Sequence, residues 1–398
     1  MGDRALTLEP LKFELGTPAR ILFGEGRVAE AGALAAGLGK RGLLVEGASG
    51  RGEPLVALLR EHHVDVAARA RVGVEPTTTL IERMIAEARA ARCDVVVAIG
   101  GGSVIDAAKA VAAMLTNGGE LLDYLEVVGR GRALAERSAP LIAIPTTAGT
   151  GAEVTRNAVL MVEDRRVKVS MRSPLMLPEV VVIDPELTYS LPPAITASTG
   201  MDALTQCIEP FVTPYANPLT DGFAREGMVR AARALGRAFD DGGDVEARRD
   251  MAVASLCGGL ALANAKLGAV HGFAGPLGGM FPVPHGVACA RLLPVVVEAN
   301  IAALRERAPS SPALARYDEV ARILTGRADA RADDAVAWLA ELGDTLGIPP
   351  LMEFGLTADA IPQVCAQARK ASSMQGNPIE LTDAELCRVL AAAMGGAR

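Results

Sequence analysis

Two of the four histidines in this 398-residue chain, His271 and His285, lie in one apolar, glycine-rich stretch, HGFAGPLGGMFPVPH. Histidine is the commonest metal ligand in proteins, although a histidine on an apolar face is more often a hydrogen-bonded core residue. The stretch GMDALTQCIEP (200–210) adds Asp202 and Gln206, which would project from one face of a helix because they are four residues apart. A carboxylate in so apolar a helix needs a nearby cation, unless it caps its own helix. These residue types allow a divalent-metal site and leave a purely structural role open.

A second kind of chemistry is indicated by the segment GGGSVIDAAKA (100–110), which directly follows the apolar run DVVVAIG (94–100). Glycines between a strand and a helix let backbone N–H groups approach a phosphate closely, and the helix N-terminus adds about half a positive charge. The segment has neither the G-x-G-x-x-G fingerprint nor the lysine and hydroxyl of a P-loop, so a tight turn without a ligand is the alternative. The predicted cofactor contacts here are Gly100, Gly101, Gly102 and Ser103.

A second loop of the same kind, PTTAGTGAEVT (145–155), follows the apolar run LIAIP (141–145). Its hydroxyl residues Thr146, Thr147 and Thr150 could donate hydrogen bonds to a phosphate, a ribose or a nicotinamide amide. Ligands of open α/β sheets bind in the crevice outside the carboxyl ends of the strands. Two ligand-type loops in such positions predict a dinucleotide site.

The elements that must position these loops alternate between short apolar runs and helical segments. Runs that are apolar throughout are expected for strands buried on both faces of a parallel sheet. Helix 77–92 is predicted to begin with a capping box of Thr79 and Glu82. The predicted strands are 19–24, 41–47, 94–100, 141–145 and 181–186, and a further helix is predicted over 27–40. We expect an α/β domain with a mostly parallel, doubly wound sheet.

After SLPPA (190–194) the pattern changes to helical periodicity with loops at glycine and proline, and we expect no strand there. The predicted helices are 217–240, 244–267, 313–326, 331–346, 357–370 and 382–394. The sequence therefore predicts an α/β dinucleotide-binding domain over residues 1–191 and an all-helical metal and substrate domain over residues 192–398.

The composition limits the function classes. A net charge of −7 and a pI near 5.4 leave no basic stripe for nucleic acid. We expect no membrane span, since no run of 18 apolar residues occurs, and no secretory signal in MGDRALTLEPLKFELG. The six cysteines are far apart without a C-x-x-C pair, which predicts reduced, mostly buried thiols in a cytoplasmic protein. His62 and His63 are predicted to be surface residues.

Several stretches together resemble the iron-containing (group III) alcohol dehydrogenases over essentially the whole chain. The two-histidine block and the ANPLTD region (216–221) carry most of the specificity of this resemblance. In chain order the matching stretches are ILFGEG (21–26), GGGSVIDAAK (100–109), PTTAGTGAE (145–153), LPEVVVIDPELTYSLPP (177–193), GMDALTQCIEPFVTPYANPLTDGFAREGM (200–228) and HGFAGPLGGMFPVPHGVACARLLP (271–294).

The resemblance implies an active site in the cleft between the two domains, where one Asp and three His of the family hold a divalent metal, Fe²⁺ or Zn²⁺. Asp202, His271 and His285 match three of those ligands, and Gln206 stands where the fourth is His. An amide oxygen is a weaker donor than imidazole, which is consistent with low metal occupancy, but three ligands suffice for a catalytic site with an open position. Gly275 replaces a family histidine that relays protons, so the proton must travel through metal-bound water, a cofactor ribose hydroxyl or solvent.

The implied reaction is hydride transfer between a nicotinamide cofactor and a small alcohol or aldehyde, with the metal polarising the substrate oxygen. Asp106 and Lys109 lie on the predicted helix after the glycine loop and are expected to steady that loop at the cofactor, and Lys168 matches a family lysine near the cofactor ribose. Since Gly275 enlarges the pocket, a substrate bulkier than ethanol is expected. We also expect a homodimer or a higher homo-oligomer.

The choice between NAD and NADP depends on RGLLVEGASGR (41–51). Family members that prefer NAD carry an Asp at the position of Gly47, and strand alternation turns Glu46 to the other face. Ser49 and Arg51 follow within reach, and a guanidinium suits a 2′-phosphate. Gly47, Ser49 and Arg51 are therefore predicted to contact the cofactor and to favour NADP, unless Arg51 only begins a surface helix.

Other functions share this fold. One is a metal-independent reductase resembling maleylacetate reductase, which metal analysis after reconstitution would distinguish. Another is a lyase resembling 3-dehydroquinate synthase, which is disfavoured because no dense set of Lys and Arg surrounds the metal block. A cofactor-binding protein with little turnover remains a third alternative, because two expected histidines are missing.

Overall fold

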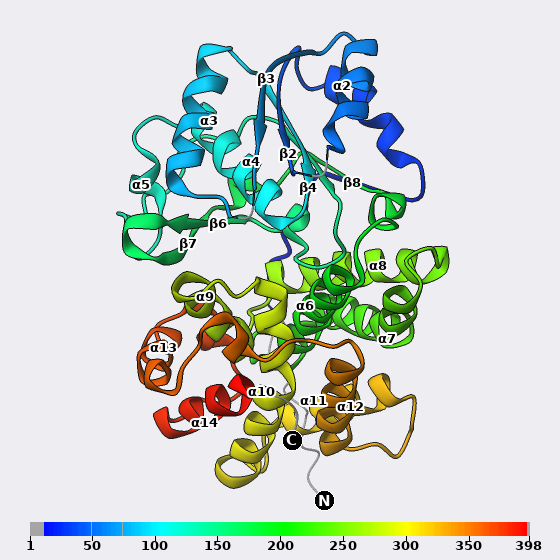
Figure 1. The fold of residues 1–398 in the computed structure, drawn as a ribbon, viewed down its shortest axis with the longest axis vertical. Helices are drawn as coiled ribbons and strands as arrows, with labels where there is room; N and C mark the ends of the chain where they lie inside the picture. The colour runs from blue at the N-terminus through cyan, green and yellow to red at the C-terminus, as the bar shows by residue number, and fades with distance from the viewer. Residues whose placement is uncertain (1–11, 49, 74, 396–398) are drawn as a thin grey trace, which may run out of the picture.

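The computed structural model describes residues 12–48, 50–73 and 75–395, so the predicted cofactor residue Ser49 lies outside the described residues. Figure 1 shows a sheet with helices in one half of the molecule and a group of helices in the other. The fold class predicted from the sequence, an α/β half followed by a helical half, is confirmed.

A six-stranded, all-parallel sheet forms the first half, in the order β1-β8-β5-β4-β2-β3. The apolar strands β4 and β5 are buried along their whole length at the centre of the sheet. Helices α1 and α2 cover one face of the sheet, and α3 and α4 cover the other (Figure 1). The strands are β1 Arg20–Phe23, β2 Arg41–Glu46, β3 Asp65–Arg71, β4 Val95–Gly100, β5 Leu141–Pro145 and β8 Val180–Ile183; the helices are α1 Ala31–Ala36, α2 Gly52–Glu61, α3 Thr78–Ala90, α4 Gly102–Thr116 and the short α5 Leu121–Tyr124.

Four details of this half differ from the prediction. The helix predicted over 27–40 is a 3₁₀ segment over Arg27–Glu30 followed by the short helix α1, which ends at Ala36. The edge strand β3 was missed because its sequence, DVAARAR, is neither apolar throughout nor strictly alternating. The antiparallel hairpin of β6 (Asn157–Val162) and β7 (Val167–Arg172) was also missed, although every second residue of β6 is buried. The capping box was wrong: Thr77, not Thr79, caps α3 by accepting a hydrogen bond from the Leu80 N–H at 3.2 Å.

The second half contains no strand among its described residues, from α6 to residue 395. Its helices are α6 Pro193–Val212, α7 Pro218–Asp240, α8 Val245–Asn264, α9 Ala269–Met280, α10 His285–Arg307, α11 Pro312–Thr325, α12 Ala332–Thr345, α13 Ile361–Ala368 and α14 Asp383–Met394. In the ANPLTD region, Asn217 and Thr220 form a capping box that starts α7. Helix α10 is long and apolar enough to cross a membrane, but it is mostly buried among the other helices, as expected for a core helix.

The two halves contact each other through loops that carry glycines. A Cβ on Gly151 would lie 2.5 Å from the Cα of Gly259 in α8, and a Cβ on Gly149 would lie 2.7 Å from the Thr199 side chain in α6. On the other side of the contact, Gly279 of α9 packs against the backbone before β7. Side chains at these glycines would push the halves apart, so the threonine loop is held directly against the helix that carries Asp202.

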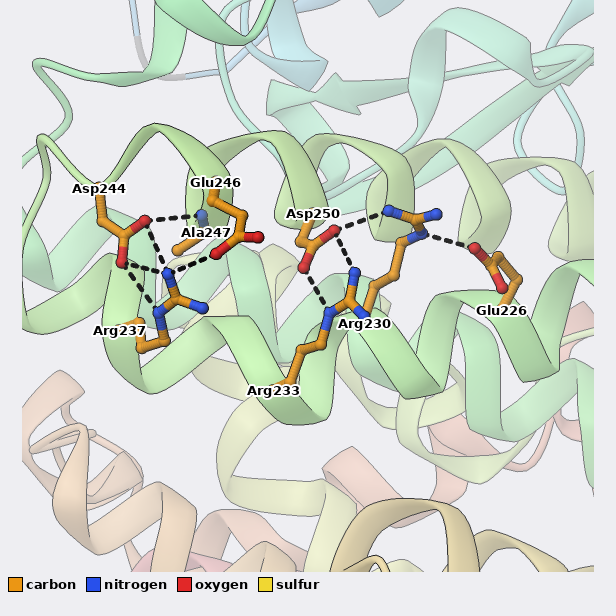
Figure 2. Close-up of polar contacts among 8 residues, drawn as sticks. All are labelled: Glu226, Arg230, Arg233, Arg237, Asp244, Glu246, Ala247 and Asp250. Atoms are coloured by element: carbon orange, nitrogen blue, oxygen red, sulfur yellow. Dashed lines mark hydrogen bonds and ion pairs between the residues drawn. The ribbon is translucent and has the colours of Figure 1, made fainter.

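Two groups of ion pairs join α7 to α8, as Figure 2 shows. The Asp250 carboxylate, which is only 4% exposed, accepts hydrogen bonds from Arg230 and Arg233 at 2.5–2.8 Å. Burial alone would raise the pKa of Asp250, but Arg233 and Arg230 hold it below its ordinary value. The second group, Arg237 with Asp244 and Glu246, is more exposed than Asp250.

Replacing Asp250 with Asn is expected to lower the free energy of unfolding by about 1–2 kcal/mol at neutral pH, because hydrogen bonds between charged groups are lost. The effect is no larger because water partly screens the charge of Arg233. A carboxyl with a lowered pKa stabilises the fold above its unfolded pKa of about 3.9 and stops doing so as the pH falls through the folded value. Urea denaturation should therefore show that the free energies of unfolding of the unmodified chain and of Asp250→Asn become more alike below about pH 4. Glu246→Gln, in the more exposed second group, serves as control and should change stability little; an equal effect of both variants would contradict the argument.

Candidate metal and cofactor site

Helix α6 supplies two of the predicted site residues from one face. Asp202 is 1% exposed and Gln206 is 2% exposed, and they lie one turn apart. Nearly all of α6 from Thr196 onward is buried, so polar side chains there must meet partners inside the protein.

Helices α9 and α10 bring the two histidines to Asp202. His271 lies in the first turn of α9 with its Nε2 3.3 Å from Asp202 Oδ1. His285 is the first residue of α10, and its Nε2 lies 3.6 Å from the same oxygen. The two rings are 5.4 Å apart between centroids, and the His285 side chain remains 39% exposed. The turn over residues 281–284 reverses the chain between the two histidines, which explains their spacing in the sequence.

Two further residues of this cluster were missed from the sequence. Glu209 Oε2 lies 2.7 Å from His271 Nδ1, and its Oε1 accepts the Val270 N–H at 2.7 Å. A carboxylate beside Nδ1 favours a proton on that nitrogen, which would leave the Nε2 lone pair free for a cation, as in many metal-bound histidines. Cys289 Sγ lies 3.8 Å from His271 Nε2 and 3.7 Å from His285 Nε2. The spacings Asp202–Glu209 and His285–Cys289, at two turns and one turn of helix, were the available signals.

The donor atoms fit a divalent cation. One ligand atom each from Asp202, His271, His285 and Cys289 lie within 4.8 Å of one another. Asp202 Oδ1 and Gln206 Oε1 are buried and accept no hydrogen bond of acceptable geometry, which is rare for buried oxygens and indicates a missing partner. Burial alone would raise the pKa of Asp202, but the His285 and His271 rings outweigh it and lower that pKa to about 2. An ionised carboxylate and two imidazoles in one place suit Zn²⁺ or Fe²⁺.

The two predicted cofactor loops lie side by side, because β4 and β5 are neighbours in register, with Gly100 opposite Pro145. The Thr146 N–H donates to the Gly100 carbonyl at 2.9 Å. A Cβ on Gly102 would lie 2.7 Å from Thr150 Oγ1, so this position has no room for a side chain. Thr147 is close to Gly101 in the same way, and Ser103 lies in the first turn of α4. The threonine loop contacts the helical half through Gly149 and Gly151, and residues 101–103 at the N-terminus of α4 are partly exposed.

Asp106 and Lys109 have partners other than those predicted. Asp106 Oδ2 accepts the Val159 N–H at 3.1 Å, and Lys109 Nζ donates to Thr155 Oγ1 and to the Asn157 carbonyl, each at 2.7 Å. Burial raises the pKa of Asp106 to about 6 and lowers that of Lys109 to about 8. Their hydrogen bonds fix α4 to β6, so both residues act on the glycine loop only through the helix that follows it.

Lys168 lies where the two halves meet. Its Nζ forms a 2.7 Å ion pair with Glu75, and a Cβ on Gly278 of α9 would lie 2.9 Å from that Nζ. Gly275, one turn earlier in α9, has nothing within 4 Å of the position its Cβ would take. The helix is therefore in tight contact with the hairpin at Gly278 and beside open space at Gly275.

The end of β2 carries the residues that bear on the choice of cofactor. Glu46 is fully buried, and Arg69 and Arg71 donate to its Oε1 at 2.6 and 3.1 Å. Its other oxygen lies against Gly52 at the start of α2, so the side chain is directed under that helix and away from Gly47, whose Cβ position faces Val104. Arg51 Nη2 donates to Ser190 Oγ at 2.6 Å.

Comparison with known proteins agrees with this geometry. The family model "Iron-containing alcohol dehydrogenase" matches residues 18–185, and "Fe-containing alcohol dehydrogenase family, C-terminal" matches residues 196–394. The chain belongs to the iron-containing alcohol dehydrogenase family. It is 35% identical over 373 residues to a choline dehydrogenase of Bacillus subtilis (strain 168), covering 92% of this chain and 91% of that protein.

Solved structures of the family have the same fold. A 1,3-propanediol oxidoreductase is 32% identical with a TM-score of 0.87, covering 96% of this chain and all of the other (100%). A sulfoacetaldehyde reductase from Bifidobacterium kashiwanohense, solved in complex with NAD⁺, is 30% identical with a TM-score of 0.83, covering 98% of this chain and 100% of the other. As a member of the iron-containing alcohol dehydrogenase family, the chain is a nicotinamide-dependent oxidoreductase of alcohols or aldehydes.

Proposed function

We propose that this iron-containing alcohol dehydrogenase holds a divalent cation, Fe²⁺ or Zn²⁺, with Asp202, His271 and His285, and that Gln206 is a weaker oxygen donor to it. The observation that carries the proposal is the convergence of one buried carboxylate oxygen and two imidazole nitrogens, at 3.3 and 3.6 Å from that oxygen, with no hydrogen-bonded partner for the oxygen. A cation is the partner that such a set of donors lacks.

When bound, the cation would polarise the substrate oxygen and the nicotinamide would carry the hydride. The chain's own residues prepare the site for this chemistry. Asp202 supplies the negative charge that offsets the cation in a buried place, and Glu209 fixes the ring of His271 through Nδ1. The loops 100–103 and 145–150 position the cofactor with backbone N–H groups and threonine hydroxyls.

The route of the proton follows from the absence of a side chain at residue 275. The family histidine at this position is Gly275 here, so no titratable group stands at that point of α9. The His285 side chain is 39% exposed, so water has access to that edge of the site. We propose that the proton of the alcohol leaves to solvent along this edge.

We also propose NADP as the preferred cofactor and a division of the chain at about residue 191 into a cofactor domain (1–191) and a metal and substrate domain (192–398). The cofactor preference is supported by Gly47, which offers no acidic group, and by Glu46, whose carboxylate is engaged by Arg69 and Arg71. Arg51 lies at the start of α2 with a guanidinium available for a 2′-phosphate. The division is supported by the end of β8 at Ile183 and the start of α6 at Pro193.

The experiment that tests the proposed function is a dehydrogenase screen of the purified chain, reconstituted with Fe²⁺ or Zn²⁺ under reducing conditions, with many alcohols and aldehydes and both nicotinamide cofactors. We expect turnover that depends on added metal and is lost with a chelator. Equal turnover of the metal-free protein would instead favour the metal-independent reductase, and cofactor binding without turnover of any substrate would favour a binding protein.

Substrates larger than three carbons are expected to be turned over, because the space beside Gly275 is open. Gly275→Leu should fill this space and lower kcat/KM for long alcohols about tenfold or more, with a smaller effect on ethanol or propanol. Gly275→Ala is the matched control, since it carries any strain that a Cβ before Pro276 creates but leaves the space open. Steady-state kinetics across a chain-length series checks the prediction; a uniform loss for all lengths would show that residue 275 does not line the substrate pocket.

A further inference from the structure

A thiol of the helical core, that of Cys289, lies among the proposed metal ligands. Cys289 is fully buried on α10, one turn after His285. Its Sγ faces the Nε2 atoms of both His271 and His285, at 3.8 and 3.7 Å. A buried cysteine usually behaves as a small apolar residue, but this sulfur lies beside the two ring nitrogens that are also nearest to Asp202.

Four distances between these atoms are close to those expected for four ligands around one ion, and all four ligand atoms lie within 4.8 Å of one another. Bonds of about 2.3 Å to sulfur and about 2.0–2.1 Å to nitrogen or oxygen place sulfur about 3.6 Å from each nitrogen, and nitrogen about 3.4 Å from oxygen. The sulfur–nitrogen distances here are 3.8 and 3.7 Å, and the nitrogen–oxygen distances are 3.3 and 3.6 Å. Small shifts of the side chains would bring all four atoms to one centre.

A second observation points to the same centre independently of the sulfur. Asp202 Oδ1 and Gln206 Oε1 are both buried and lack hydrogen-bond partners. Gln206 stands where the family resemblance implies a histidine ligand, so the site has lost its strongest fourth donor from α6. Cys289 approaches from α10 instead, on a different element.

We propose that the thiolate of Cys289 is a metal ligand that compensates for Gln206, giving an Asp–His–His–Cys site of Asp202, His271, His285 and Cys289. The proposal rests on the proposed metal site and adds a fourth strong donor to it. On binding, the thiol releases its proton to solvent and the sulfur donates an electron pair to the cation, with no change of oxidation state. Because thiolate is a soft ligand, the site should bind Zn²⁺ and Co²⁺ in preference to Mg²⁺ or Mn²⁺.

The test is Co²⁺ reconstitution of the full chain after removal of metal with a chelator, followed by absorption spectroscopy. Cobalt in a site with a thiolate shows a sulfur-to-metal charge-transfer band in the near ultraviolet, besides the visible bands of any tetrahedral Co²⁺. We expect the charge-transfer band in the unmodified protein and in Cys365→Ser, a control at an equally buried cysteine of α13. Cys289→Ser should lose this band, keep visible bands at higher cobalt concentration and bind Co²⁺ about tenfold or more weakly.

The outcomes separate this inference from the metal site itself. Visible bands without a charge-transfer band in the unmodified protein, or a charge-transfer band that persists in Cys289→Ser, would overturn the thiolate ligand and leave the other three ligands standing. No bound cobalt in the unmodified protein would overturn the metal site and the thiolate together. X-ray absorption at the zinc edge of the unmodified, zinc-loaded chain gives a check that needs no variant: one sulfur neighbour is expected, and none would refute the proposal.

Discussion

His271→Ala is expected to abolish tight binding of Fe²⁺ or Zn²⁺ and to lower kcat/KM by about a thousandfold. The ring provides one of the proposed ligand nitrogens, and its loss also leaves Glu209 Oε2 without its partner in the protein interior, while Oε1 keeps the Val270 N–H. Polarisation of a substrate oxygen by a metal is worth several kcal/mol, and each 1.4 kcal/mol or so is a factor of about ten in rate. Metal content after dialysis and steady-state kinetics on the same preparation measure both effects.

Two further variants make this result specific. Glu209→Gln keeps all the proposed ligands but weakens the acceptor that orients His271, so metal affinity should fall about 10- to 100-fold and added metal should restore activity. His63→Ala changes an exposed histidine at the end of α2 and should leave metal content and activity unchanged. If His271→Ala kept its metal and its activity, the metal assignment would fall and the metal-independent reductase would become the better reading of this fold.

The parts of the site that could be predicted are those carried by local pattern. The glycine loop and the threonine loop follow apolar strands, and parallel strands place their carboxyl ends at one edge, so the closeness of Gly100 and Thr146 was predictable. Asp202 and Gln206 share a helix face for the same kind of reason. That His271 and His285 meet Asp202 came from the resemblance to a family, since their contact depends on how α6, α9 and α10 cross.

The parts that could not be predicted depend on contacts between distant segments. Glu209 and Cys289 read as ordinary members of apolar helices, and only the crossing of those helices shows that they face His271. Lys109 and Asp106 match a family motif on α4, but their partners lie in and beside the β6–β7 hairpin, which the sequence analysis missed. The strand β3 was missed because charged residues interrupt its pattern. Two of these residues, Arg69 and Arg71, form ion pairs with Glu46 at the end of β2, so the Glu46 carboxylate is already engaged.

We expect the second large effect at Arg51, on the choice between the two nicotinamide cofactors. A charge-assisted contact between its guanidinium and a 2′-phosphate is worth about 1.5–3 kcal/mol, which would favour NADPH by about ten- to a hundredfold. The guanidinium is held at the start of α2 by Ser190 Oγ, at 2.6 Å, and Ser190 is neutral, so the positive charge is not cancelled by this contact. Arg69 and Arg71 are already paired with Glu46, so we expect Arg51 to be the cation that binds the 2′-phosphate.

We therefore expect kcat/KM to be higher with NADPH than with NADH in the unmodified chain, and Arg51→Ala to remove most of the difference by raising KM for NADPH alone. Arg60→Ala is the matched control, since Arg60 is an exposed arginine in the last turn of the same helix and should leave the ratio unchanged. Raising the ionic strength should reduce the preference for NADPH, as for any partly exposed ion pair.

If NADH proved equal or better in the unmodified chain, the alignment of Gly47 with the family aspartate would be wrong by one residue. Glu46 would then have to leave Arg69 and Arg71 and accept hydrogen bonds from the ribose hydroxyls instead. Arg69→Ala would make this movement easier, so we would expect it to increase the preference for NADH further.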